Sequence, residues 1–105
     1  MKDIIVFKNR TTILPVNLGF DVSDDTITSQ IRVGKDSESE LIAEWDVSFV
    51  TDGTDGKVLL TLDNSISATI TQKAGYTDMK RVSGGEPFPV YDSSIRVSFR
   101  EVVTV

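Results

Sequence analysis

Apolar and polar residues alternate with a period of two along much of the chain. The clearest example is the segment 41–50, in which one face carries Trp45 and four other apolar residues, and the other carries Glu44, Asp46 and Ser48. This period is expected of a β-strand with one buried face, whereas a helix would scatter the same residues around its circumference. We therefore predict a strand here, with Trp45 at the centre of the core.

Further strands are predicted over 14–20, 27–33, 58–62, 76–82 and 95–105. In the first of these, Pro15 removes a backbone donor, which predicts an edge strand or a bulge. In the last, apolar residues fall on one face from Ile95 to Val105, but the alternation breaks near Glu101. We expect a β-bulge at that break.

The connections follow from glycine, proline and capping residues. Two Asp-Gly pairs within 50–57 supply positions for positive φ and predict a hairpin. The segment 83–89 holds two glycines and two prolines, and we predict a longer turn without regular structure there. The run Asp63-Asn64-Ser65 can cap one or two turns of helix, in which Ile66 and Ile70 would share a face.

Six to eight short strands with at most one helical turn predict an all-β sandwich or barrel. With 105 residues, the chain has the length of one ordinary domain, and no linker or internal repeat divides it. We predict a single domain over 1–105. The opening apolar run of four residues is far too short for a signal peptide or a membrane span.

Composition narrows the functions that this fold can carry. Cysteine and histidine are both absent, which removes thiolate nucleophiles, imidazole bases, disulfides and the usual zinc ligands. Eleven basic and 16 acidic residues give a net charge of −5, which disfavours binding to nucleic acid and to anionic membranes. We expect no enzymatic activity, no cofactor and no bound metal.

Three groups of carboxylates offer alternatives to that expectation. The turn 52–56 and the aspartates at 21, 24 and 25 have oxygens that calcium could use, although neither has the spacing of a calcium loop. Acidic residues between 36 and 46 could pair for glycoside hydrolysis, but a short chain has little material to wall a groove. Ordinary turn and surface roles explain all three groups.

A candidate assembly surface combines aromatic and basic residues of the C-terminal half. Residues 1–62 hold 11 acids and 6 bases, whereas 63–105 hold 5 of each, which could make the surface self-complementary. Aromatic residues in or beside the glycine and proline turn could add a docking site. The alternatives are solvated charges and a loop packed over the sandwich. The candidate residues are Tyr76, Lys80, Arg81, Phe88, Tyr91, Arg96 and Arg100.

Several stretches resemble small virion proteins of tailed bacteriophages that have immunoglobulin-like or baseplate-type modules. The stretches are the opening Ile4 to Arg10, the segments 24–32 and 43–47 with the strand after Lys57, the segment 75–87, and the close at 95–99 and 102–105. The resemblance spans nearly the whole chain, which favours a complete small protein. It implies a single immunoglobulin-like β-sandwich of about seven strands with one short helical turn.

The resemblance also implies an assembly role, with no catalytic residues to transfer. We expect a component of the tail, the baseplate or a fibre attachment, made in the host cytoplasm and located in the virion. Its partners would be other virion proteins and further copies of itself. The alternatives are a capsid decoration or head-fibre protein, and a module that binds host-surface carbohydrate through Trp45 or the aromatic loop.

Overall fold

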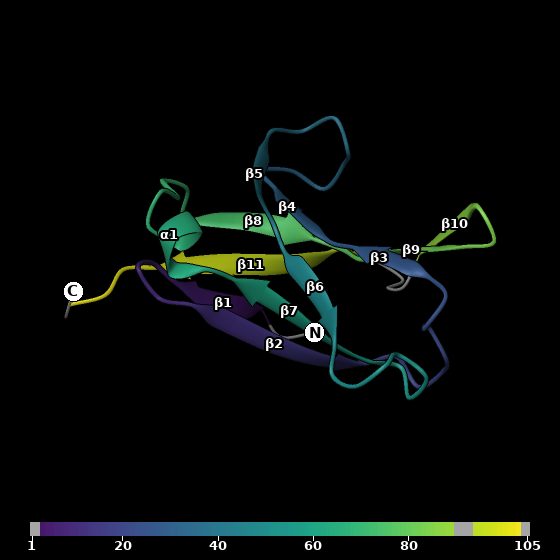
Figure 1. Ribbon diagram of the computed structural model, residues 1–105. Helices are drawn as coiled ribbons and strands as arrows, with labels where there is room; N and C mark the ends of the chain where they lie inside the picture. The colour runs from purple at the N-terminus through teal and green to yellow at the C-terminus, as the bar shows by residue number, and fades with distance from the viewer. Residues whose placement is uncertain (1–2, 90–93, 104–105) are drawn as a thin grey trace.

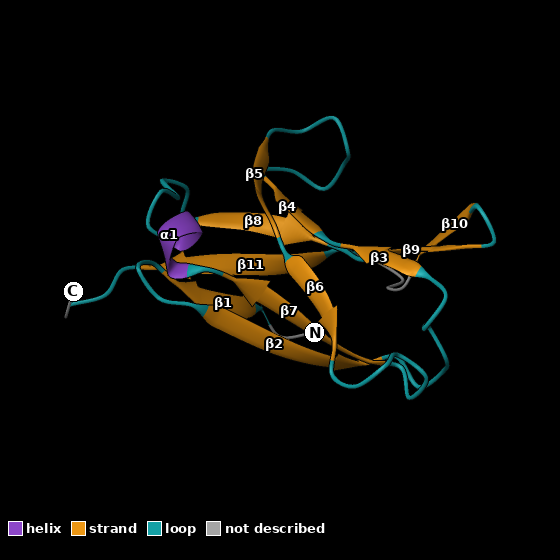
Figure 2. Ribbon diagram, viewed as in Figure 1, coloured by secondary structure: helices purple, strands orange, loops and turns teal. Residues whose placement is uncertain are grey.

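The computed structural model describes residues 3–89 and 94–103, and nearly all of their regular secondary structure is β-strand (Figures 1 and 2). One sheet has the order β1-β11-β8-β4-β5, from the strands Ile4–Phe7 (β1), Ile95–Arg100 (β11), Ala74–Thr77 (β8), Gln30–Arg32 (β4) and Leu41–Glu44 (β5). A second has the order β2-β7-β6, from Thr12–Asn17 (β2), Lys57–Leu62 (β7) and Asp46–Phe49 (β6). A third has the order β10-β9-β3, from Glu86–Pro89 (β10), Lys80–Ser83 (β9) and Thr26–Thr28 (β3).

The connectivity is that of an immunoglobulin-like sandwich. If β3 with β4, β5 with β6, and β8 with β9 are each counted as one bent strand, seven strands make the sandwich and β10 is added to them. The second, fifth and fourth of the seven form one sheet, and the third, sixth and seventh form the core of the other, as in immunoglobulin domains. The first strand, β1, joins the seventh, β11, in parallel.

Three strands that the alternation predicts as continuous are bent between sheets, so those predictions were wrong about continuity. The bends lie at Ser29, at Trp45 and after Thr77. Hydrogen bonds connect them: the Trp45 amide donates to the Ser29 carbonyl at 2.9 Å, and the Ser29 hydroxyl donates to the Asp78 carbonyl at 2.6 Å. The Thr77 hydroxyl donates to the Gln30 carbonyl at 2.8 Å. These bonds satisfy buried polar groups where the ladders break.

The core lies between the facing sheets, as predicted, and Trp45 is within it at 2 % exposure. Leu41, Val33 and Phe20, which the alternation assigned to buried faces, are exposed instead. The register of β4 against β5 shifts between Ile31 and Arg32, and this irregularity turns Leu41 outward. The buried apolar residues are Val6, Val22, Ile27, Ile31, Ala43, Trp45, Val58, Leu60, Leu62, Ile70, Met79, Ile95, Val97 and Phe99.

Several local predictions are confirmed. Pro15 lies in β2, which is an edge strand, and 50–57 connects β6 to β7 as a hairpin. The helix α1 spans Asn64–Ser67, and the Asp63 side chain caps it by accepting from the Ser65 amide. Ile66 and Ile70 do not share a helical face, because the helix ends at Ser67. No helix of residues 3–89 and 94–103 is long and apolar enough to cross a membrane.

Two predictions near the C-terminus were wrong. Gly84 and Gly85, both at positive φ, form a tight turn that pairs β9 with β10, so the segment 83–89 is a regular hairpin that projects from the body (Figure 1). Its prolines are tolerated because β10 is an edge strand. The final strand ends at Arg100 without a bulged continuation, and Val103 is fully exposed. Val105 lies outside the described residues.

Candidate interaction surface

Period-two alternation places a distinct set of side chains on the solvent side of the five-stranded sheet. In β11, Ile95, Val97 and Phe99 point into the core, so Arg96 and Arg100 point outward. Residues directly opposite on paired strands share a face, which extends the set across the sheet. We call this set the outer face: Ile5, Phe7, Gln30, Arg32, Leu41, Glu44, Ala74, Tyr76, Arg96, Ser98 and Arg100.

Large apolar side chains are exposed on the outer face. Ile5 is 42 % exposed, Phe7 47 % and Leu41 46 %. Phe7 lies opposite Arg100 in the β1–β11 ladder, and Tyr76 lies opposite Arg96 in the β11–β8 ladder. Aromatic residues and arginine are the types enriched in protein interfaces. The outer face therefore has the composition of an interface.

Among the described residues, the two arginines of β11 make only an exposed ionic contact and a long hydrogen bond. Arg96 Nη1 lies 2.6 Å from Asp3 Oδ2, and both side chains are about half exposed. Arg100 Nε donates to Ser98 Oγ at the long distance of 3.4 Å. Exposed ion pairs contribute little to stability. Both guanidinium groups can therefore exchange these contacts for others.

Arg32 instead fixes the neighbouring loop 33–40. Its guanidinium donates to the Ser39 carbonyl and to Gln30 Oε1, both at 2.8 Å. Gln30 Nε2 in turn donates to Glu44 Oε2 at 3.1 Å. This chain of bonds ties the loop to β4 and β5 at the border of the outer face.

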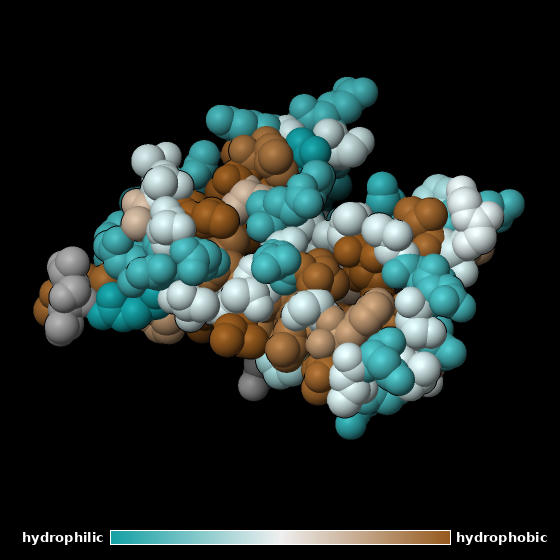
Figure 3. Space-filling view, in the orientation of Figure 1, coloured by the Kyte–Doolittle hydropathy of each residue, from teal (hydrophilic) through white to brown (hydrophobic). Residues whose placement is uncertain are grey.

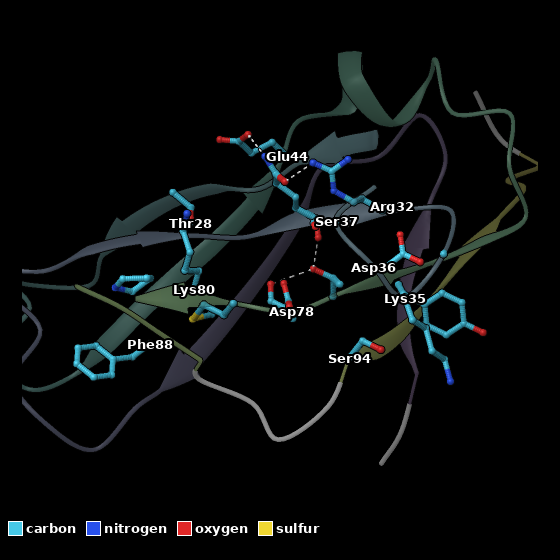
Figure 4. A pocket seen from close by; sticks show the side chains of 16 residues that line it. Thr28, Arg32, Lys35, Asp36, Ser37, Glu44, Asp78, Lys80, Phe88 and Ser94 are labelled. Atoms are coloured by element: carbon cyan, nitrogen blue, oxygen red, sulfur yellow. Dashed lines mark hydrogen bonds between the residues drawn. The ribbon is translucent and has the colours of Figure 1, made fainter. Parts of the chain in front are cut away.

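A groove of about 560 Å³ adjoins the outer face where β8 bends into β9 (Figure 4). Tyr76 lines it from β8, Asp78 from the bend and Lys80 from β9, and Thr28 lines it from β3. The loop 34–37 forms part of its lining, with Lys35 Nζ 5.1 Å from the centroid of the Tyr76 ring. The groove thus combines an aromatic ring with charged groups of both signs.

Arg81 lies on the opposite side of β9 from Lys80. It faces Ile27 in β3 and Phe88 in β10, and its guanidinium carbon lies 5.0 Å from the Phe20 ring centroid and 4.9 Å from that of Phe88. Arg81 Nη1 also pairs with Asp25 Oδ2 at 3.0 Å. Hydrogen bonds from Ser83 and Arg81 lower the pKa of Asp25 below its ordinary value of 3.8. Arg81 therefore anchors the β9–β10 hairpin to the loop before β3.

The structure divides the predicted assembly residues. Tyr76, Arg96 and Arg100 lie together on the outer face, and Lys80 adjoins them in the groove. Arg81 belongs to the anchor, and Phe88 contacts it while also lining the groove. Tyr91 lies outside the described residues. The prediction omitted Ile5 and Phe7, which β1 presents on the outer face.

Three of the carboxylates considered for calcium accept hydrogen bonds within their own loops. Asp52 Oδ1 accepts from the Thr54 amide at 3.0 Å and from its hydroxyl at 2.6 Å, which lowers the Asp52 pKa. Asp55 accepts from the Lys57 amide, and Asp21 from the Ser23 amide. Within the described ranges, no three carboxylates cluster as a metal site would require.

Comparisons with known proteins identify no family for this chain. No protein-family model matches the chain, and no curated protein matches it.

Proposed function

We propose that this protein is a structural component of a tailed-bacteriophage virion, in the tail, the baseplate or a fibre attachment. It works by protein–protein assembly through its outer face and performs no catalysis. The observation that carries the assembly role is the exposure of Ile5 and Phe7 beside Tyr76, Arg96 and Arg100 on one sheet face. The phage context comes from the sequence resemblance.

The energetics of such an interface favour many weak contacts. Full burial of one large apolar side chain contributes roughly 1.5–3 kcal/mol, and Ile5 and Phe7 each have about half of their surface left to bury. Their contribution suits a modest affinity for each contact. A virion repeats each contact in many copies, and linked contacts raise the overall affinity without new interactions.

The test is incorporation into particles. Phage particles that contain this chain would be purified by density gradient and analysed by peptide mass spectrometry. We expect the chain to co-sediment with particles, and its recovery only in the soluble fraction would refute a virion role. Separate analysis of isolated heads and tails distinguishes a tail component from the alternative of a capsid decoration or head-fibre protein.

Paired variants then test the outer face. Phe7→Ser removes an exposed apolar group from β1, and Ile13→Ser removes one, 59 % exposed, from β2 in the other sheet. We expect Phe7→Ser to reduce incorporation severalfold and Ile13→Ser to leave it unchanged, with both variants folded by circular dichroism. Equal incorporation of the two variants would remove the outer face from the proposal.

The groove supports a second candidate function, the binding of host-surface carbohydrate. Trp45 cannot take part, because it is buried in the core. Tyr76 offers an aromatic surface, and Thr28, Asp78 and Lys80 offer hydrogen-bonding groups around it. A glycan array with the wild-type chain and with Tyr76→Ala tests this candidate. Binding that the variant loses would support it, and a blank array would count against it.

A further inference from the structure

The outer face has an electrostatic complement on the same molecule, and we propose that it binds the loop end of a second copy of this chain. The loop end consists of residues 18–25 and 50–57. The inference rests on the proposed function, because it names the partner of the assembly surface.

The two segments of the loop end form one unit. The Leu18 amide donates to the Gly56 carbonyl at 2.8 Å, and the Val22 amide donates to the Gly53 carbonyl at 2.9 Å. A Cβ on Gly53 would lie 2.9 Å from the Ser23 Cα, so the two segments are in close backbone contact. The loop end therefore presents its side chains from a rigid frame.

The loop end is strongly acidic. Its exposed carboxylates are Asp21, Asp24, Asp52 and Asp55, and its only basic residue is Lys57. A fifth carboxylate, Asp25, is already paired with Arg81. The loop end also exposes Phe20 and Val50, which supply apolar surface beside the charge.

The outer face offers the opposite charge with apolar neighbours. Arg96 and Arg100 project from β11, and among the residues that the structure describes only Arg96 of the two has an acidic partner. Phe7 and Ile5 lie beside them on β1. Complementary patches of this kind steer association and set its register. The loop end of a second copy supplies carboxylates for the arginines, and its exposed Phe20 and Val50 supply apolar groups for Phe7 and Ile5.

The two surfaces belong to different parts of the molecule. The loop end closes one end of the sandwich (Figure 1), whereas the outer face is the solvent side of the five-stranded sheet. A contact between them is heterologous, because it joins the loop end of one copy to the outer face of a second copy. Each of the two copies then has one surface left for a further copy. Heterologous contacts generate rings or open filaments, which are the assemblies that a repeated virion component requires.

Charge reversal with mixing tests this contact. Arg100→Glu reverses the outer face, and Asp24→Lys reverses the loop end at a side chain that makes no hydrogen bond in the described structure. Glu38→Lys is the matched control, since it makes the same charge change in the exposed loop 33–40. Sedimentation velocity would follow wild type, each variant alone, and the equimolar mixture of Arg100→Glu with Asp24→Lys.

We expect the wild-type chain to self-associate, and to do so more weakly at high salt because salt screens exposed charges. Each reversed variant alone should associate at least about tenfold more weakly, a loss of about 1.4 kcal/mol. The mixture should recover association, because each variant supplies the charge that the other lacks, and Glu38→Lys should behave as wild type. These results together support the contact.

A mixture that stays as weak as its components would overturn the inference, and so would a wild-type chain that remains monomeric at all concentrations tested. If that monomeric chain still co-sediments with particles, the outer face binds a different virion protein. In that case the proposed function stands and only the self-contact fails.

Discussion

Two turns of this molecule depend on glycines at positive φ, but their surroundings differ. In the loop end, a Cβ on Gly56 would lie 2.4 Å from the Phe20 carbonyl oxygen and 2.8 Å from the Phe20 amide nitrogen. In the β9–β10 hairpin, a Cβ on Gly84 or Gly85 would have no atom within 4 Å. The first turn requires glycine for space and conformation, and the second for conformation alone.

The difference distinguishes a turn that is packed against other backbone from a turn that projects into solvent. The loop end is locked by backbone contact between segments far apart in the sequence, which suits a surface that must present fixed charges. The β9–β10 hairpin projects from the body and is tied to it by β3 and by the Arg81 anchor.

Gly56→Ala should be the most damaging change. The alanine would hold a strained positive φ, which costs roughly 1–3 kcal/mol. Its Cβ would also overlap the Phe20 backbone, and overpacking of this kind costs roughly 1–3 kcal/mol more. We therefore expect urea denaturation to show a loss of about 3 kcal/mol in the free energy of unfolding. A loss below about 1 kcal/mol would show that the loop end is not locked.

The Arg81 anchor should make stability depend on acid. The pKa of Asp25 is lowered in the folded state, so ionised Asp25 stabilises the fold at pH values above the ordinary carboxylate pKa. This stabilisation is lost as the pH falls through the pKa that Asp25 has in the folded state. Asp25→Asn should therefore be less stable than wild type at neutral pH. The difference should shrink on acidification below about pH 4, because Asp25 becomes protonated in the wild type. Asp52 and Asp63 are present in both proteins, so their titration does not contribute to the difference.

Urea midpoints at neutral and acidic pH measure this effect for both proteins. A gap between wild type and Asp25→Asn that stays constant across the range would contradict the anchor. Arg81→Met serves as a second check, because it removes the cation and keeps a long side chain. Its dependence on pH should lie between those of wild type and Asp25→Asn, because the Ser83 hydrogen bond still lowers the pKa of Asp25.

Gly84→Asn should have the smallest effect. Asparagine tolerates positive φ, an Asn-Gly pair is favoured in two-residue hairpin turns, and the site has free space. We expect the free energy of unfolding to change by less than about 0.5 kcal/mol. A loss as large as that of Gly56→Ala would remove the distinction between the two turns.

Sequence patterns predicted those parts of the fold that depend on local chemistry. The Asp-Gly hairpin and the Asp63 cap depend on nearby residues, and both were correct. The bends at Ser29 and Trp45 could not be predicted, because alternation continues through them while the backbone changes partner sheet. The Gly84-Gly85 hairpin was missed because prolines argue against a strand unless it is known to lie at an edge.

The candidate site was also predicted only in part, where alternation within one strand was enough to place a side chain. Alternation in β11 placed Arg96 and Arg100 opposite the buried Val97 and Phe99, so their exposure followed from the pattern. The same rule could have separated Lys80 from Arg81, since neighbours in a strand face opposite sides. The apolar run that contains Ile5 and Phe7 carries no such alternation, and their exposure depends on the register of β1 against β11, which puts them on the outer face.

The central claim is that the outer face is buried in an assembly, and thiol labelling tests it directly. The chain has no cysteine, so Phe7→Cys and Ile13→Cys each introduce a single reactive thiol, one on the outer face and one on the opposite sheet. Both should react with a maleimide in the free chain. In purified particles, the thiol at position 7 should be protected and that at position 13 should still react. Equal reaction of the thiol at position 7 in the free chain and in particles would contradict the account.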